Sequence, residues 1–333
     1  MKEAMYYNKL EENKIKCKLC NHFCVISEGK RGICRVRENR RGKLYSLVYG
    51  YAAADNIDPI EKKPLFHFYP GSSSYSVSTV GCNFSCLHCQ NWSISQVDSG
   101  EIFGREISPK KIVNNAIAGR CKSIAYTYTE PTVFYEYAYD IAKLAHKTGL
   151  KNIFVTNGYI SRDALTEFSP YLDGANIDLK SMRNSFYKKI CNAKLTPVLD
   201  NIKLYYNLDI WIEITTLIIP GYNDDSEELK KIAEFIRSID ADIPWHVTAF
   251  HPTYKLTNAP STQVKTLRKA VEIGKKTGLN YVYQGNVIEG ENTYCPKCGK
   301  LLIERNIYRI TENNIKNENC SFCGEHIEGK WTI

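Results

Sequence analysis

The most chemically informative residues of this chain are three closely spaced cysteines. Cys82, Cys86 and Cys89 lie in the segment VGCNFSCLHCQ, in the pattern Cx3CxxC. Cysteine thiolates hold [4Fe–4S] clusters, normally one thiolate per iron, so three cysteines leave one iron without a protein ligand. An open coordination position distinguishes a catalytic metal site from a closed structural one. The spacing therefore predicts a cluster that binds a substrate or cofactor directly. A structural zinc and inert thiols are the alternatives.

Eight further cysteines form one group near each end of the chain. Two CxxCG knuckles form the C-terminal group, which predicts a closed structural zinc site, with a rubredoxin-like iron as the alternative. The N-terminal group is less regular, and its spacing favours zinc over a second cluster while leaving both open. The predicted ligands are Cys17, Cys20, Cys24 and Cys34 in the N-terminal group, and Cys295, Cys298, Cys320 and Cys323 in the C-terminal group.

Length and composition describe an ordinary globular protein. The chain has 333 residues, of which 43% are hydrophobic, and a net charge of +8. This charge favours an acidic partner, either an electron-donor protein, for which we expect the flavodoxin or ferredoxin type, or a nucleic acid. No basic run with interleaved aromatics marks a nucleic-acid surface, so a nucleic acid is the less favoured partner. Neither a signal-peptide-like run nor an apolar stretch long enough to span a bilayer is evident, so we expect a cytoplasmic protein. Cys121 and Cys191 stand alone and are expected to be buried.

The middle of the chain alternates short apolar strands with helical stretches. Repeated βα units imply a parallel sheet, and we expect a partial (β/α) TIM-like barrel of about six units. The barrel would occupy residues 72–290, between a cysteine-rich segment at 1–71 and a zinc-ribbon-like segment at 291–333. The expected strands are Tyr75–Val80, Ser123–Thr127, Asn152–Val155, Ala175–Leu179, Ile210–Ile219, Trp245–Phe250 and Asn280–Val282. The main helices expected are Ser108–Gly119, Thr132–Thr148, Ser161–Phe168, Ser226–Ile239 and Ser261–Thr277.

Polar residues follow most of the expected strands. In (β/α) barrels the chemistry lies at the carboxyl ends of the strands. The three cysteines follow the first strand, Thr127–Pro131 the second, Thr156–Gly158 the third and Asp178–Lys180 the fourth, and His251 follows the sixth. Hydrogen-bonding and ionisable groups at so many strand ends favour an enzyme over a purely structural barrel.

These motifs resemble, in the same order, those of the radical S-adenosylmethionine (radical SAM) superfamily, and especially those of pyruvate formate-lyase activating enzymes. Within that group, Asp58–Gly71, Thr79–Gln96 and Tyr126–Phe134 are similar to the radical enzyme of the AmmeMemoRadiSam system. The resemblance implies that the amino and carboxylate groups of SAM chelate the open iron. It also implies that an injected electron cleaves the sulfonium to methionine and a 5′-deoxyadenosyl radical, which abstracts a hydrogen atom.

The resemblance further implies which residues receive the methionine amino group. Glu130, with the neighbouring backbone of Tyr128 and Thr129, matches the motif that does so, and a carboxylate suits an ammonium donor. Thr127 and Tyr128 stand where the family has small glycines, so the approach of the backbone to the ligand would differ here.

The other residues matched to SAM lie at later strand ends and in the cysteine loop. Asp178 matches a contact to the ribose hydroxyls, and Lys180 matches a partner of the methionine carboxylate. His251 matches a late-strand contact to SAM, and His88 takes the place of a ring near the adenine. Asn157 belongs to the matching Thr-Asn-Gly stretch.

The sequence therefore predicts a radical SAM oxidoreductase, similar to glycyl-radical activases, that acts on a partner protein or a small molecule. Its expected cofactors are a [4Fe–4S] cluster, SAM and structural zinc. One alternative is a radical SAM enzyme that modifies a nucleic acid or a peptide gripped by the terminal metal segments. A second alternative is a non-catalytic metal-binding adaptor or electron carrier, which would form no 5′-deoxyadenosine from SAM.

Overall fold

The computed structural model describes residues 1–98 and 101–332. At its centre is a sheet of eight strands in the order β16–β15–β14–β13–β12–β11–β9–β8. Neighbouring strands are parallel except β8 and β9, which pair antiparallel. The strands are β8 (Ala54–Pro59), β9 (Ser73–Ser78), β11 (Ser123–Tyr126), β12 (Lys151–Thr156), β13 (Gly174–Asp178), β14 (Trp211–Ile218), β15 (Trp245–Ala249) and β16 (Val282–Gly285).

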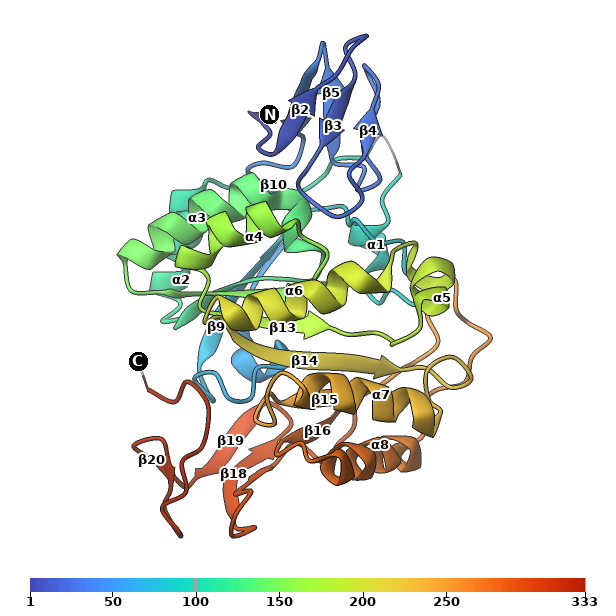
Figure 1. The fold of residues 1–333 in the computed structure, drawn as a ribbon. Coiled ribbons are helices and arrows are strands. Elements are labelled where there is room, and N and C mark those ends of the chain that lie inside the picture. Colours follow the sequence, from blue (N-terminus) through green and yellow to red (C-terminus); the bar gives the residue numbers. More distant parts are fainter. Residues whose placement is uncertain (99–100, 333) are drawn as a thin grey trace.

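Helices in the connections between these strands pack on the sheet (Figure 1). Helix α3 contacts β11 and β12, α6 contacts β14, and α8 contacts β15 and β16. Apolar residues at helical spacing explain this packing, as Leu229, Ile232 and Ile236 of α7 are all buried. The longer helices are α2 (Pro109–Ala118), α3 (Tyr135–Lys147), α4 (Arg162–Phe168), α6 (Leu195–Asn207), α7 (Ser226–Arg237) and α8 (Val264–Thr277).

The architecture confirms the expected partial barrel. Seven parallel strands are joined by six crossover connections, which agrees with about six βα units. In the described ranges β8 and β16 form the two edges and do not pair, so the barrel is open. Among the helices of those ranges, none is long and apolar enough to cross a membrane.

Several boundaries differ from the expected ones by one to three residues, and hydrogen bonds explain two of these differences. Helix α8 begins at Val264 rather than Ser261, because the Thr262 hydroxyl bonds to the backbone just beyond β15 and at the end of β14. The last strand begins at Val282 rather than Asn280, because the amide of Asn280 donates to a loop carbonyl outside the sheet. Both differences reflect tertiary hydrogen bonds, which the apolar pattern of the sequence does not encode.

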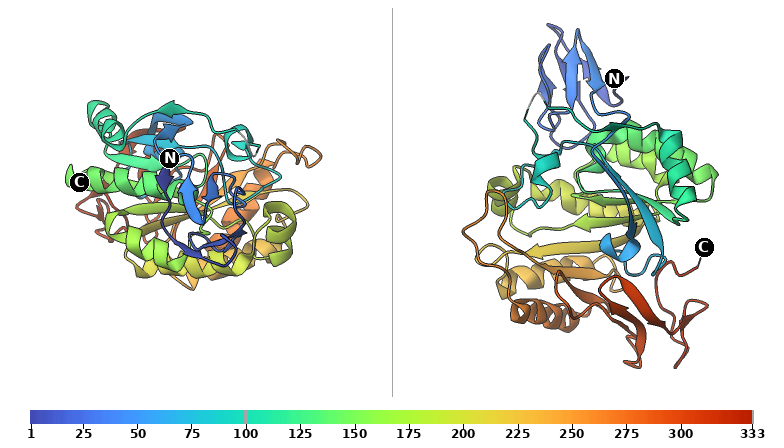
Figure 2. Two further views of the ribbon diagram at one scale, coloured as in Figure 1. Left: turned by 90° about the horizontal axis from the view of Figure 1, so that it is seen from above. Right: turned by 180° about the vertical axis from the view of Figure 1, so that it is seen from behind.

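The N-terminal segment forms two small antiparallel sheets at one end of the molecule (Figure 2). Strand β8 belongs to the expected segment 1–71, yet it pairs along its whole length with β9 of the central sheet. The small strands are β1 (Lys2–Glu3), β2 (Tyr7–Lys9), β3 (Ile15–Cys17), β4 (Val25–Ile26), β5 (Arg37–Arg40), β6 (Lys43–Ser46), and the pair β7 (Tyr51–Ala52) and β10 (Arg105–Glu106).

The C-terminal segment lies at the opposite end of the molecule (Figures 1 and 2). It docks on the 58–71 motif: the buried Arg305 donates to the carbonyl of Phe66 at 2.9 Å and lies 4.4 Å from the centre of its ring. The amide of Lys330 donates to the carbonyl of His67 at 2.7 Å. Its strands are β17 (Thr293–Tyr294), β18 (Leu301–Asn306), β19 (Arg309–Asn313), β20 (Ile315–Lys316) and β21 (Asn319–Cys320).

Candidate functional site

The cysteine loop, residues 80–90, follows β9 at the carboxyl edge of the parallel sheet. Two backbone hydrogen bonds fix it on the π-helix η4 (Tyr187–Cys191), which follows the short helix α5 (Asn184–Phe186). The amides of Ser85 and Leu87 donate to carbonyls of η4, each at 3.0 Å. The loop therefore has a defined path rather than a free one, and its three cysteines are held at a fixed place above the sheet.

Two of the loop thiols have hydrogen-bond donors nearby. The amide of Phe84 donates to Cys82 Sγ at 3.4 Å, and Ser95 Oγ, in the short helix α1 (Trp92–Ser95), lies 3.1 Å from Cys89 Sγ. Burial raises the pKa of both thiols. Donors of this kind stabilise a thiolate, and hydrogen bonds to the sulfurs help to set the potential of an iron–sulfur cluster.

The third thiol, Cys86, lies beside Cys191 and Lys180. A hydrogen bond from Cys191 is the main reason that the pKa of Cys86 is lowered. Burial opposes the charge of Lys180, but the nearby Asp178 and Cys86 outweigh burial and raise its pKa. Lys180 Nζ donates to Asp178 Oδ2 at 2.7 Å. The structure thus brings the predicted pair at the end of β13 next to the cysteine loop. Cys191 is buried as expected, but it is not isolated in space.

Glu130 joins the ends of β11 and β12. Its buried carboxylate accepts from the amide and hydroxyl of Thr132 at 3.1 and 2.6 Å, from the Thr156 hydroxyl at 2.8 Å and from the Asn157 amide at 2.8 Å. Four hydrogen bonds match the acceptor capacity of a carboxylate. Burial raises the pKa of Glu130, while these donors oppose the shift. The carboxylate therefore fixes the strand ends against the 3-10 helix η2 (Pro131–Phe134).

Tyr128 adopts a backbone conformation that glycine normally occupies. Its φ is +63°, and the amide of Thr129 bonds back to the carbonyl of Thr127 at 2.8 Å. The carbonyl of Tyr128 accepts from Asn91 Nδ2 at 2.8 Å, and its hydroxyl donates to Asp58. Although the residue here is a tyrosine, the chain follows the left-handed turn that a glycine would favour, and hydrogen bonds to Asn91 and Asp58 hold it there.

The remaining predicted residues differ in their surroundings. His88 is buried, burial lowers its pKa to about 3, and its Nδ1 has no hydrogen-bond partner among the described residues. Asn157 Nδ2 lies 3.9 Å from Cys82 Sγ. His251 follows β15 and is exposed, and its Nδ1 lies 3.4 Å from Ser261 Oγ. The structure shows no hydrogen bond between His251 and the other predicted residues among those it describes. A buried polar atom without a partner needs an explanation, and a bound ligand beside the loop would provide one for His88.

The three cysteine groups differ in the spacing of their thiols. In the part of the chain that the structure describes, the C-terminal group is the one set of three or more ligand atoms that all lie within 4.8 Å of one another. Its sulfurs are 3.6 Å apart in the pair Cys295–Cys323 and 3.8 Å in the pair Cys298–Cys320. A tetrahedral ion with bonds of about 2.3 Å requires sulfurs about 3.8 Å apart. The cysteine loop forms no such close set among the described residues, and thiols that bind separate irons of one cluster do not need to.

Comparisons with known proteins agree with this geometry. The profile of the radical SAM superfamily matches residues 76–236. The uncharacterized protein MJ0808 of Methanocaldococcus jannaschii is 49% identical over 98% of this chain and 99% of its own. Pyruvate formate-lyase 1-activating enzyme of Escherichia coli is 22% identical, over 61% of this chain and 89% of its own.

A solved structure shares the fold. A radical SAM methyltransferase from Sphaerobacter thermophilus superimposes with a TM-score of 0.51 and 14% identity, over 70% of this chain and 71% of its own. Membership of the superfamily implies a [4Fe–4S] cluster and SAM as cofactors, and the three thiols of the cysteine loop and the unpartnered His88 nitrogen fit these two groups. The chain belongs to the radical SAM superfamily and is related to the pyruvate formate-lyase activating enzymes.

Proposed function

We propose that the protein holds a [4Fe–4S] cluster through Cys82, Cys86 and Cys89 and cleaves SAM reductively at the open iron. When bound, the two cofactors supply one-electron cleavage of the sulfonium to methionine and a 5′-deoxyadenosyl radical. The observation that carries the proposal is the ion pair of Asp178 and Lys180 beside Cys86, at the carboxyl edge of the sheet. A cation and an acceptor next to an incomplete thiolate set suit a zwitterionic ligand with hydroxyl groups.

The roles proposed for the strand-end residues follow from their charge. Lys180 would bind the methionine carboxylate, and Asp178 would accept from the ribose hydroxyls. The turn Tyr128–Glu130 would receive the methionine ammonium, with the Glu130 carboxylate holding the turn in place. His88 lies in the cysteine loop and would face the adenine with its unpartnered ring nitrogen. Asn157 would support this side of the site through Cys82.

His251 is proposed as a peripheral contact to the same ligand, because it follows β15 at the same edge of the sheet. Its exposure supports a role at the mouth of the site rather than at the cluster. The burial of Cys86 and His88 supports the exclusion of water, which protects a radical from side reactions.

We propose a protein as the acceptor of the radical, by analogy with the relatives named as activating enzymes. An electron-donor protein of the flavodoxin or ferredoxin type would supply the electron, in the cytoplasm. Mass analysis of candidate proteins, peptides, nucleic acids and small molecules after reaction tests this choice. A modification found only in a nucleic acid, a peptide or a small molecule would contradict the proposal that the protein acts like an activase on a partner protein.

The closed C-terminal group is proposed to hold structural zinc. Its support is the sulfur–sulfur spacing, which matches one tetrahedral ion, and the small core of the C-terminal segment. Four thiolates around one ion leave no open position and therefore stabilise a fold rather than perform chemistry.

The experiment that tests the proposed function is formation of 5′-deoxyadenosine by the anaerobically purified, dithionite-reduced protein with SAM. We expect product from the wild type and from Cys121→Ala, a matched control in a buried cysteine far from the loop in sequence. We expect none from Cys86→Ala, with loss of the loop iron. Zinc at all three cysteine groups, no iron and no product would contradict the proposal.

A further inference from the structure

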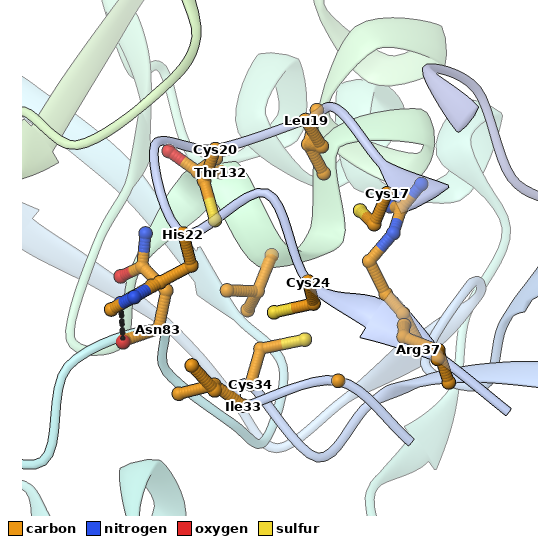
Figure 3. A pocket seen from close by; sticks show the side chains of 13 residues that line it. Cys17, Leu19, Cys20, His22, Cys24, Ile33, Cys34, Arg37, Asn83 and Thr132 are labelled. Carbon is orange, nitrogen blue, oxygen red and sulfur yellow. Dashed lines mark hydrogen bonds between the residues drawn. The ribbon is translucent and has the colours of Figure 1, made fainter. Parts of the chain in front are cut away.

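The four N-terminal cysteines line one small cavity. Figure 3 shows the thiols of Cys20, Cys24 and Cys34 turned toward its interior, with Cys17 beside them. The cavity measures about 20 Å³, and apolar side chains fill much of its remaining wall. Cysteines separated by up to 17 positions in the sequence (17 to 34) therefore meet at one place between β3, β4 and the turns that follow.

These thiols do not form the close set that the C-terminal thiols form. In the described ranges, three or more ligand atoms lie within 4.8 Å of one another in the C-terminal group and in no other. The thiols of the cysteine loop, which belongs to a superfamily that binds a cluster there, form no such close set among the described residues either. Sulfurs held by one zinc would lie about 3.8 Å apart. The N-terminal arrangement therefore resembles the cluster loop rather than the ribbon.

A buried hydrogen-bond donor without a partner lies in the wall of the cavity. Arg37 is almost fully buried and pairs with Glu136 through both terminal nitrogens, each at 2.9 Å. Its Nε has no hydrogen-bond partner among the residues described. Figure 3 shows the guanidinium group beside Cys17. A buried N–H donor facing thiols suits an anionic cluster, whose sulfurs accept hydrogen bonds and whose charge a cation stabilises.

The cavity adjoins the cysteine loop. Asn83, which follows Cys82 directly, is part of the cavity wall, and its carbonyl lies 2.7 Å from His22 Nε2 (Figure 3). Cys20 forms a β-bridge with Ile160 in the loop after β12. The cavity of the N-terminal cysteines thus adjoins the cysteine loop, since its wall includes Asn83, the residue next to the proposed ligand Cys82.

From these observations we infer that Cys17, Cys20, Cys24 and Cys34 bind a second iron–sulfur cluster, next to the first, and not zinc. The cluster could be of the [4Fe–4S] or the [2Fe–2S] type, and in either type every iron would have a protein ligand. Such a cluster would exchange electrons and bind no substrate. Its role rests on the proposed function: it provides a route for one electron from an external donor protein to the loop cluster. The donor is oxidised by one electron and the loop cluster is reduced by one.

The experiment measures iron, sulfide and zinc, with electron paramagnetic resonance (EPR), in anaerobically reconstituted full-length protein. We expect the wild type to hold more than about four irons per chain, since one cubane cluster accounts for four. The triple variant C82A/C86A/C89A should keep at least two irons with matching sulfide, about one zinc and an EPR signal that SAM does not change.

Two outcomes would overturn the inference: about two zinc ions and no iron in the triple variant, or iron that survives in C20S/C24S but not in the triple variant. Neither measurement depends on SAM cleavage, so a failure of this inference can be told apart from a failure of the proposed function. A second measurement tests the role in electron transfer. In C20S/C24S the rate of 5′-deoxyadenosine formation should fall at least tenfold with a donor protein as the reductant and less than twofold with dithionite. Equal rates with both reductants would contradict the role.

Discussion

The side-chain amide of Asn157 donates a hydrogen bond to the side-chain oxygen of Asn83 at 2.8 Å. Asn157 follows β12, and Asn83 lies in the cysteine loop and in the wall of the N-terminal cavity. This contact joins three parts of the chain that are far apart in sequence. The end of the parallel sheet, the cysteine loop and the N-terminal segment therefore pack against one another.

Replacement of Lys180 tests the proposed binding of SAM. Lys180→Met keeps most of the apolar stem of the side chain and removes its charge, so the methionine carboxylate would lose a charge-assisted partner worth about 1.5–3 kcal/mol. We expect the Kd for SAM to rise about 10- to 100-fold. Lys231→Met, on the exposed face of α7, is the control and should bind like the wild type. An unchanged Kd in Lys180→Met would remove Lys180 from the site.

Glu130 should be important for stability as well as for the site. In Glu130→Gln, an amide group faces donors that a carboxylate accepts, and leaving one buried donor unpaired costs about 1–3 kcal/mol. We expect a lower thermal unfolding midpoint together with weaker SAM binding. Glu227→Gln, at an exposed position, should change neither. If Glu130→Gln matched the wild type in both measurements, the four hydrogen bonds to this carboxylate would have no energetic importance.

Acid should destabilise the protein through His67. Burial lowers the pKa of His67 to about 4, against about 6.5 in an unfolded chain. The unfolded chain thus binds the proton more tightly, so His67's contribution is complete above about pH 6.5 and is lost as the pH falls toward about 4. The full difference corresponds to about 3 kcal/mol.

The measurement compares thermal midpoints at pH 7.5 and pH 5. The wild type should lose more stability between these values than His67→Gln, which has no titrating ring between Tyr283 and the carbonyl of Glu328. His326→Gln changes an exposed histidine and should behave like the wild type. Parallel curves for the wild type and His67→Gln would show that His67 titrates normally in the folded state.

Removal of one C-terminal thiol should release the proposed zinc. Cys298→Ser leaves three thiolates in a site that needs four, so we expect zinc to fall by about one ion per chain and the thermal midpoint to fall as well. Cys121→Ser should retain the metal. Zinc content equal to that of the wild type in Cys298→Ser would show that the C-terminal group does not hold it.

Much of the barrel could be predicted because its pattern is local. Alternating apolar strands and helices fix a parallel sheet, and parallel strands place all their carboxyl ends at one edge. Asp178 and Lys180 could therefore be expected near the cysteine loop. Strand β8 was not predicted, because it is an antiparallel edge strand whose sequence, ADNIDP, contains residues that strands usually lack.

Other contacts of the site depend on tertiary packing and have no local signal. Cys191 reaches Cys86 because η4 accepts backbone hydrogen bonds from the cysteine loop. No spacing rule links residues 86 and 191. The left-handed turn at Tyr128 is also hidden in the sequence, since tyrosine rarely adopts it and only its anchored carbonyl and hydroxyl explain it.

The most direct test of the central claim is whether SAM binds the iron that the three cysteines leave open. Electron–nuclear double resonance (ENDOR) measures this contact. The sample is the reduced protein with SAM that carries 15N in its amino group. We expect a hyperfine coupling from the labelled nitrogen in the wild type and in C20S/C24S, and none in Cys86→Ala. A cluster signal that shows no coupling and does not change when SAM is added would contradict the account.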